Sequence, residues 1–364
     1  MCNIFKWLEQ FMIKDSLLIK NGLIVTVNDK SEIFNGDILV KDKRIAQIGQ
    51  NIDTSADSIF DASGLIISPG FIQTHVHLCQ ALFRNMADDL SLLDWLKKKI
   101  WPLEGSHTEN SLRASACLGL AELLLGGTST IMDMGTVHHM QVVFEEIEKS
   151  GIRALCGKTM MDDGDIPDSL RESTADSVSQ SLELLKEWHG AANGMIRYAF
   201  APRFVLTCSD KLLSKSFELA NEYGTLFHTH AAENREEIRL VQDRYGMRNI
   251  SLFKKMGISG PNVCLAHCVW LDEEEKNILE QEQIKVLHCP SANLKLGSGI
   301  APIPEYLDRG ISVSLGSDGA PCNNNMNIFN GMRLATLIPE PVYGPTAMNA
   351  ETVFRMATID GARA

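Results

Sequence analysis

The chain has 364 residues, of which 45% are hydrophobic and 22% are charged, so it is long enough for one large barrel or two domains and has an ordinary soluble composition. Its net charge of -12 argues against nucleic acid or an anionic membrane surface as the main partner, because such partners are bound by clustered lysine and arginine. Nine cysteines, an odd number without a C-x-x-C pair, favour reduced thiols in a cytoplasm over a disulfide framework.

The first part of the chain is expected to form an extension followed by a small β domain. Residues 1–15 are assigned to the extension, in which residues 1–12 have a roughly helical spacing of apolar positions but are too short to span a bilayer. Residues 16–66 are assigned to the β domain. Its strand-like runs are 17–19, 23–27, 37–40 and 44–48, separated by turn-type residues at Asn21-Gly22, 28–30 and Asn35-Gly36.

Residues 67–364 are expected to form an α/β barrel of the (β/α)8, TIM type. The strand-like runs are 71–77, 128–133, 152–160, 195–203, 225–231, 262–268, 284–289 and 311–318. The helix-like runs are 109–126, 139–150, 170–189, 210–223, 234–244 and 272–282. Eight strands alternating with helices predict a barrel whose chemistry lies at the C-terminal strand ends. A doubly wound open sheet is the alternative, but no G-x-G-x-x-G motif opens a helix.

Histidines and one aspartate recur at the ends of the expected barrel strands. They are His75 and His77 at the first strand, His228 and His230 at the fifth, His267 at the sixth, His288 at the seventh and Asp318 at the eighth. Two imidazoles at positions i and i+2 of a strand face the same side and are preorganised to bind a metal. A Zn²⁺ or Fe²⁺ centre fits the pair on the first strand, one histidine of the fifth and the aspartate of the eighth.

Three further side chains near this barrel mouth have candidate roles. Metal binding lowers the pKa of a bound water from ~15.7 to about 7, and a nearby carboxylate can then carry the proton to a leaving group. Glu233, on the loop after the fifth strand, is the best placed carboxylate, and His267 could orient the attacked atom. The role of His288 is left open between a supporting hydrogen bond, packing on the turn at 291–293 and a purely structural role.

Five motifs in sequence order resemble the amidohydrolase superfamily. They are P-G-F-I-Q-T-H-V-H at 69–77, H-x-x-E at 230–233, A-H-C at 266–268, H-C-P-S-A-N-L-K-L-G-S-G at 288–299 and G-S-D-G-A-P at 316–321. The resemblance is to the branch that holds S-adenosylhomocysteine, methylthioadenosine and 5'-deoxyadenosine deaminases, guanine deaminases and triazine hydrolases. It covers nearly all of residues 17–364.

This resemblance implies a set of site residues, a cofactor and an assembly. The implied metal ligands are His75, His77, His230 and Asp318, and the implied catalytic residues are Glu233, His267 and Asp318. The likeness thus selects His230 over His228, which spacing alone could not do. One divalent metal is implied, with zinc as the first choice and iron as the alternative, and a homodimer is common among similar enzymes.

The expected substrate contacts are Gln80, Trp95, Glu104, Arg203 and Phe204, and they point to different substrates. The segment with Trp95 and Glu104 resembles adenosine-type deaminases, which place a glutamate on the ribose hydroxyls. Arg203 and Phe204 instead resemble guanine deaminases, whose Arg-Phe pair grips the purine, and an arginine fork suits an oxo-purine. The segment 318–325 is closer to the adenosine and triazine enzymes, and Gln80 occurs in several of these branches.

The sequence therefore predicts a cytoplasmic, metal-dependent hydrolytic deaminase of purine metabolism that acts on a small molecule, without nucleic-acid or membrane partners. The expected substrate is an aminopurine base or nucleoside, namely guanine or a 5'-substituted adenosine such as 5'-deoxyadenosine or S-adenosylhomocysteine. One alternative is a chlorohydrolase or aminohydrolase of triazine-type heterocycles. The alternative from another class is a catalytically inactive barrel that acts as a binding protein.

Proteins of this kind normally continue past the position of Ala364 with a glycine-rich strand segment that completes the small β domain. We therefore expect a small N-terminal β-sandwich whose C-terminal half is missing. Unpaired strand edges and exposed apolar surface are the expected consequences.

Overall fold

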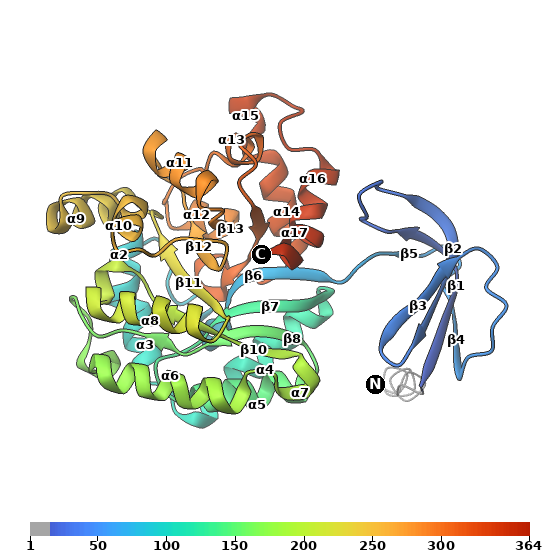
Figure 1. Cartoon of the computed structure of the whole chain (residues 1–364), viewed down its shortest axis with the longest axis horizontal. Helices are drawn as coiled ribbons and strands as arrows, with labels where there is room; N and C mark the ends of the chain where they lie inside the picture. The colour runs from blue at the N-terminus through green and yellow to red at the C-terminus, as the bar shows by residue number, and fades with distance from the viewer. Residues whose placement is uncertain (1–14) are drawn as a thin grey trace. The chain divides into compact units, whose positions relative to one another are not determined.

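A computed structural model describes residues 15–364, so the helix expected within residues 1–12 lies outside the described residues. The chain divides at Pro69/Gly70 into a small unit and a large unit, and each is described by itself (Figure 1). Within residues 15–364, no helix has the length and apolar character needed to cross a membrane. The eight cysteines of this part of the chain are all free thiols, as expected.

The small unit is a five-stranded β-sheet with the order β3-β2-β1-β4 and with β5 beside β1. Its strands are β1 (Ser16–Val25), β2 (Ile33–Lys41), β3 (Arg44–Gly49), β4 (Ser58–Asp61) and β5 (Ile66–Ile67). Strand β1 pairs antiparallel with β2 and parallel with β4. Several apolar side chains of this unit are exposed: Ile33 and Ile45 by 61% each, Ile59 by 65% and Ile66 by 70%.

Two of the expected strand breaks in the small unit are wrong. Asn21-Gly22 lies inside β1, where the register between Ile19 and Gly22 shifts by a β-bulge and Asn21 has a φ of 63°. An asparagine tolerates this left-handed conformation, so the same residues that suggested a turn form the bulge instead. Asn35-Gly36 lies inside β2, and a Cβ on Gly36 would come within 2.7 Å of the carbonyl oxygen of Gly49 on the neighbouring strand.

The large unit is a parallel sheet in the order β14-β13-β12-β11-β10-β8-β7-β6-β15, with β9 beside β10. Strands β14 and β15 are successive segments of the eighth strand position, and they pair with β13 and β6 respectively, so the sheet closes into the expected TIM-type barrel. The strands are β6 (Phe71–His77), β7 (Thr128–Met134), β8 (Arg153–Gly157), β9 (Thr159–Met160), β10 (Ile196–Pro202), β11 (Leu226–Ala231), β12 (Val263–His267), β13 (Lys285–His288), β14 (Val313–Leu315) and β15 (Asp318–Gly319).

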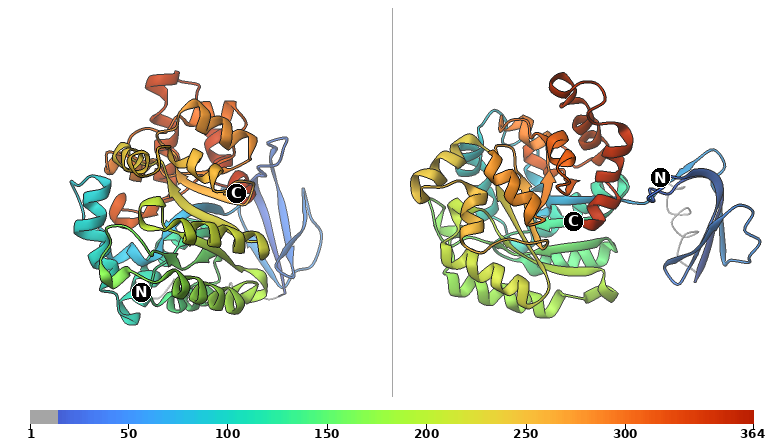
Figure 2. Two further views of the ribbon diagram at one scale, coloured as in Figure 1. Left: turned by 60° about the vertical axis from the view of Figure 1, so that its left-hand side comes forward. Right: turned by 45° about the horizontal axis from the view of Figure 1, so that its top comes forward.

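Helices alternate with these strands and cover the outer side of the barrel (Figure 2). They are α2 (Leu92–Trp95), α3 (Trp101–Gly105), α4 (Glu109–Leu125), α5 (Met140–Ser150), α6 (Thr174–Trp188), α7 (Ala191–Gly194), α8 (Asp210–Glu222), α9 (Arg235–Tyr245), α10 (Asn249–Lys255), α11 (Glu273–Gln281), α12 (Pro290–Lys295), α13 (Ile303–Asp308), α14 (Ile328–Leu337), α15 (Glu340–Tyr343), α16 (Ala350–Met356) and α17 (Ile359–Arg363). Shorter turns of helix are η1 (Leu78–Phe83), η2 (Leu96–Ile100), η3 (Asp168–Leu170), η4 (Val205–Thr207) and η5 (Ala320–Cys322).

Local sequence accounts for where several of these helices begin. Thr108, Asn234 and Asp272 precede α4, α9 and α11, and each forms a capping box with the residue three positions later. Such caps satisfy amide groups that the first turn of a helix leaves without partners. The six helices expected from periodicity are all present, whereas the helical segments between residues 92 and 105 were not expected.

The eighth strand is interrupted where it passes the histidine-bearing strand β6. A Cβ on Gly316 would lie within 2.6 Å of the carbonyl oxygen of His75, so this close approach requires glycine. After the interruption, β15 pairs with β6 so that Asp318 is opposite Val76 and Gly319 is opposite His77. The pairing brings the carboxylate of Asp318 to the level of the two histidines.

Candidate active site

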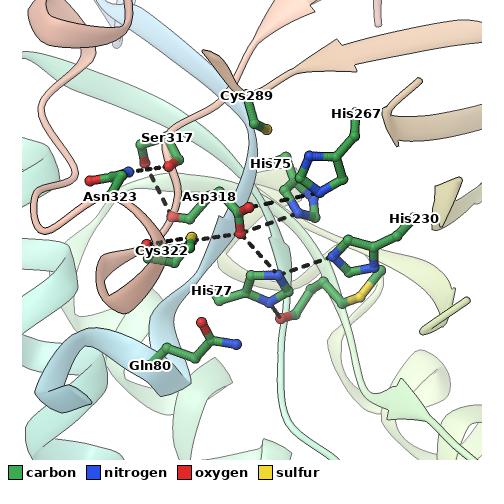
Figure 3. A network of polar contacts seen from close by, with 12 residues as sticks. His75, His77, Gln80, His230, His267, Cys289, Ser317, Asp318, Cys322 and Asn323 are labelled. Atoms are coloured by element: carbon green, nitrogen blue, oxygen red, sulfur yellow. Dashed lines mark hydrogen bonds and ion pairs between the residues drawn. The ribbon is translucent and has the colours of Figure 1, made fainter. Parts of the chain in front are cut away.

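Side chains from β6, β11 and β15 converge at the C-terminal end of the barrel (Figure 3). The Nε2 atoms of His77 and His230 are 3.3 Å apart. The Oδ1 atom of Asp318 lies 3.4 Å from Nε2 of His77 and 3.6 Å from Nε2 of His75. Donors of a tetrahedral zinc at ~2.0–2.1 Å are roughly 3.3 Å apart, so these separations are those of atoms that can share one cation.

Hydrogen bonds behind the histidines turn their lone pairs toward this centre. The Nδ1–H groups of His77 and His230 donate to the carbonyl oxygens of Met134 and Arg203, each at 2.8 Å. Nε2 of both rings is then the unprotonated atom that faces the centre. Burial lowers the pKa of both rings well below the usual histidine value, which favours the neutral form that binds metal.

His75 is held by one of the two fifth-strand histidines between which spacing alone could not choose. Its Nδ1 lies 2.8 Å from Nε2 of His228, and both rings are fully buried. His228 therefore orients His75 rather than joining the group around Asp318. Nε2 of His75 is buried and has no hydrogen-bond partner among residues 15–364. An orphaned imidazole nitrogen beside two others and a carboxylate is a donor set that fits a divalent cation.

The other side of the same centre is surrounded by Glu233, His267 and the Oδ2 atom of Asp318. Nε2 of His267 is 3.4 Å from Oε2 of Glu233 and 3.7 Å from Oδ2 of Asp318. Burial raises the pKa of Glu233 to about 7, although a hydrogen bond from Ser298 opposes the rise. Burial also raises the pKa of Asp318 to about 6, against the opposing effect of His267. Both carboxyls can therefore exchange protons near neutral pH.

The backbone at two of these strand ends is in the left-handed region. His267 has a φ of 75° and Asp318 a φ of 64°, which is uncommon for residues other than glycine. Such strain persists where the surrounding structure enforces it, and it is concentrated at functional sites. Here it directs the two side chains toward each other across the barrel mouth.

A cavity open to solvent lies at this centre, and the empty space within it is about 410 Å³. It is lined by His77, Gln80, Leu92, Trp95, Leu96, Arg203, Phe204, His230, Glu233, Glu237, His267, Leu296 and Asp318. Four of the five expected substrate contacts are among these residues. The exception is Glu104, which lies behind the wall and accepts hydrogen bonds from Arg203 at 2.6 Å and from Gln80 at 2.8 Å.

Two residues at the site were not singled out from the sequence. Glu237 accepts hydrogen bonds from the backbone N–H groups of Ala232, Glu233 and Asn234, so it fixes the loop that carries Glu233. The capping pattern of Asn234 and Glu237 before α9 was the available signal. Asn293 accepts a hydrogen bond from Nδ1–H of His267 at 2.9 Å, a contact across two barrel strands that local sequence does not reveal.

Asp133 supports the site from the neighbouring strand β7. Its Oδ1 accepts a hydrogen bond from the backbone N–H of Leu78, directly after His77, at 2.8 Å. Its Oδ2 is buried without a partner among the described residues, and burial raises its pKa from 3.8 to about 7. Between about pH 4 and pH 7 the folded state therefore holds a proton that the unfolded state has released. The resulting stability is complete below pH 4 and is lost as the pH rises through 7.

The substitution Asp133→Asn is expected to remove this pH dependence. An amide stays neutral and can still accept from Leu78, so the variant should match the wild type below pH 4, already be the more stable protein at pH 5 and exceed the wild type most at pH 8. The gain should be a few kcal/mol, since one pKa unit corresponds to about 1.4 kcal/mol. Urea denaturation of chelator-treated protein at pH 5 and at pH 8 measures this gain in the free energy of unfolding. If the free energy of unfolding changed equally with pH in the variant and the wild type, a neutral buried Asp133 would be contradicted.

Residues 66–364 match the model of the amidohydrolase family. The chain belongs to this family. The resemblance drawn from the five motifs is thereby confirmed, and so is the class of enzyme, a hydrolase that acts on carbon–nitrogen bonds.

Two relatives and a solved structure to which the chain is similar are named as deaminases. A 5-methylthioadenosine/S-adenosylhomocysteine deaminase of Thermococcus onnurineus is 39% identical over 96% of the chain and 81% of the relative. A 5'-deoxyadenosine deaminase of Methanobrevibacter smithii is 39% identical over 96% of the chain and 79% of the relative. The structure of guanine deaminase from C. acetobutylicum with bound guanine superimposes with a TM-score of 0.89 at 27% identity, covering 95% of this chain and 86% of that one.

Proposed function

We propose that this amidohydrolase is a metal-dependent hydrolytic deaminase that releases ammonia from an aminopurine. The observation that carries the proposal is the meeting of three imidazole nitrogens and the Asp318 carboxylate beside Glu233, in a cavity of about 410 Å³. His75, His77, His230 and Asp318 would hold the metal. Nitrogen and carboxylate donors at tetrahedral spacing suit zinc, with iron as the alternative. A cation bound there supplies Lewis acidity and activates water at neutral pH.

The protein side chains move the protons and hold the reacting ring. Glu233 takes a proton from the attacking water and delivers it to the ring nitrogen next to the carbon that bears the amine, because its pKa near 7 allows both directions. His267 faces Glu233 and Asp318 through Nε2 while its Nδ1–H is bound to Asn293, and it orients the attacked position. Asp318 accepts the second proton of that water at Oδ2 and transfers it to the exocyclic amine, which leaves as ammonia.

The wall around Arg203 supports a free oxo-purine base such as guanine as the first candidate substrate. Arg203 is buried, and Glu104 raises its pKa although burial alone would lower it, so the guanidinium stays charged. Arg203 already donates through Nη1 and Nη2 to Glu104, so its remaining N–H groups are the ones that can donate to the carbonyl oxygen and ring nitrogen of an oxo-purine, while Phe204 provides a stacking face. Glu104 is already bound to Arg203 and Gln80 and is not free in this arrangement to accept from ribose hydroxyls.

A 5'-substituted adenosine is the second candidate substrate, and the relatives favour it. Two proteins that are each 39% identical over nearly the whole chain are named as deaminases of methylthioadenosine, S-adenosylhomocysteine or 5'-deoxyadenosine. Trp95 lines the cavity with an indole N–H that lacks a partner within the described part of the chain, so the site can still offer a donor to a larger ligand. A ribose would require Glu104 to leave Arg203.

The experiment that tests the proposal measures ammonia and chloride release from a panel of compounds by zinc-loaded protein. The panel contains guanine, adenosine, 5'-deoxyadenosine, S-adenosylhomocysteine and a chlorotriazine. Ammonia release from guanine or from one of the nucleosides supports a purine deaminase and chooses between the two candidates. Chloride release alone would replace it by a triazine hydrolase, and zinc-loaded protein without turnover of any compound would favour a binding protein.

A further inference from the structure

Residues 85–105 form one wall of the active-site cavity, and this segment is here termed the cover. It contains α2, η2 and α3, and its side chains Leu92, Trp95 and Leu96 line the cavity. The buried apolar side chains of the cover pack in a cluster that is distinct from the large core around the barrel strands. The cover can therefore shift while the barrel core stays packed.

The backbone of the cover is irregular at its entry and in its middle. Asn85 and Asp89 have φ angles of 60° and 59°, in the left-handed region. Between α2 and α3, η2 is a π-helical turn, a departure from α-helical hydrogen bonding that is frequent at functional sites. A hinge consists of a few loop or element-terminal residues that absorb changes in φ and ψ, and residues 85–91 form such a loop.

Lys295, on α12, binds the entry of the cover. Its Nζ donates to the carbonyl oxygen of Pro321 at 2.7 Å and to Oδ1 of Asn324 at 2.9 Å, and it forms an ion pair with Asp88. These partners use all three N–H groups of the ammonium. Nδ2 of Asn324 also donates to Asp88 at 3.3 Å, and the backbone N–H of Asn85 donates to Oδ1 of Asn324 at 3.2 Å. The side chain of Lys295 is 20% exposed, so this group of contacts is partly shielded from water.

The position of Lys295 in the chain places it beside residues that act directly on the site. It lies two positions after Asn293, which accepts from His267, and directly before Leu296, which lines the cavity. Its carbonyl and amide acceptors are in the segment that follows Asp318. One ammonium group therefore connects the entry of the cover to α12 and to the segment that carries the Asp318 carboxylate.

We propose that Lys295 is a positioning residue that holds the cover closed over the cavity by binding Asp88. Release of this ion pair lets the entry of the cover, residues 85–96, move away so that a ligand can enter or leave. The exit of the cover stays attached, because Glu104 in α3 is paired with the buried Arg203. The motion follows from these contacts alone, whereas its effect on a purine rests on the proposed function.

Hydrogen exchange of the intact protein, followed by mass spectrometry, tests this role without turnover. In Lys295→Met, the amide hydrogens of residues 85–96 should exchange about tenfold faster, because charge-assisted hydrogen bonds no longer oppose opening. In Asp88→Asn, the new amide can still accept from Asn324, so the increase should be about threefold, as for a partly exposed ion pair. The amides of α4 and of the barrel strands should exchange at the wild-type rate in both variants.

The matched control is Lys98→Met, which removes a lysine of the cover itself. Lys98 pairs with Asp94 at 3.0 Å, and both residues belong to the cover, so this ion pair does not attach the cover to α12. Exchange of residues 85–96 should stay within about twofold of the wild-type rate.

The effect on a ligand is measured with zinc-loaded Glu233→Gln protein, which is expected to bind substrate without turning it over. Guanine and 5'-deoxyadenosine are the probes, and stopped-flow tryptophan fluorescence gives the signal because Trp95 lines the cavity. Addition of Asp88→Asn should raise the rates of binding and of release about threefold each and leave Kd unchanged. The cover is closed with and without ligand, so the ion pair sets only how often it opens. A role confined to shaping the site would change Kd instead.

Unchanged exchange of residues 85–96 in Lys295→Met or in Asp88→Asn overturns the proposal, and so does an acceleration spread evenly over the barrel or shared by Lys98→Met. If Lys295→Met does not fold, Asp88→Asn decides, because it alters an exposed side chain. A changed Kd with unchanged rates overturns the control of ligand entry. If neither purine binds, the proposed substrate class fails, while the exchange measurement still decides the role of Lys295.

Discussion

Replacement of Glu233 by glutamine is expected to reduce turnover by about 10²–10⁴-fold while the metal stays bound. Glutamine preserves the shape of the side chain and can still accept from Ser298, but it cannot carry a proton between water and the purine ring. Glu233 is not one of the four proposed ligands, and its nearest histidine contact is His267 at 3.4 Å. The measurement is kcat for ammonia release together with the metal content of the same sample.

The matched control for this variant is Glu236→Gln on the same loop and helix. Glu236 is exposed in the first turn of α9, and its side chain is outside the residues that line the cavity. We expect it to retain wild-type turnover. A Glu233→Gln protein with full metal content and turnover within about tenfold of wild type would remove Glu233 from the mechanism.

The second large effect is expected on stability, from Arg203→Met. Arg203 and Glu104 form an ion pair in which the side chains are 5% and 4% exposed. Methionine removes the positive charge and leaves Glu104 buried with hydrogen bonds only from neutral groups, the amide of Gln80 and the thiol of Cys79. Breaking one half of a buried pair typically costs about 3–5 kcal/mol, because the other charge stays desolvated. Urea denaturation of metal-free protein measures the loss.

Two comparisons show whether the loss comes from the unpaired charge. The double variant Arg203→Met with Glu104→Gln should recover part of the stability, since no buried charge remains. Arg239→Met breaks an ion pair with Asp243 in which both side chains are 62% exposed, and it should change stability very little. If the Arg203→Met protein were as stable as the wild type, removal of Arg203 would not leave Glu104 as an unpaired and desolvated charge, and the prediction would be wrong.

The strands and helices that follow from local sequence patterns were predictable. β6 was expected at its observed bounds, because a short run that follows Pro69-Gly70 and carries histidines at positions i and i+2 is a local strand pattern. The break at Asn21-Gly22 was wrong because a bulge and a turn use the same residues, and the break at Asn35-Gly36 was wrong because that glycine lies in a paired strand, close to the carbonyl oxygen of Gly49. Pairing with the neighbouring strand decides whether such residues form a turn, a bulge or part of a strand, and sequence periodicity carries no information about that pairing.

The candidate site was predictable to the level of its residue types and their place at strand ends. His75, His77, His230 and Asp318 do meet, and they do so because β15 pairs with β6 across the closed barrel. The hydrogen bonds that support these four side chains could not be predicted from the sequence. The role of His228 behind His75, for example, depends on the tilt of two strands that are 153 residues apart in the chain. Glu104 is hydrogen-bonded to Arg203 and Gln80 and does not line the cavity, and this position likewise depends on tertiary contacts.

The metal content of the protein tests the central claim most directly. Metal-free protein dialysed against zinc, and then against zinc-free buffer, should retain one zinc per chain by elemental analysis. His77→Ala and Asp318→Ala should each lose nearly all of it, while His138→Ala, which changes an exposed histidine, should retain it. Equal zinc in His77→Ala, Asp318→Ala and the wild type, or less than about a tenth of an equivalent in the wild type, would contradict a metal centre at these four side chains.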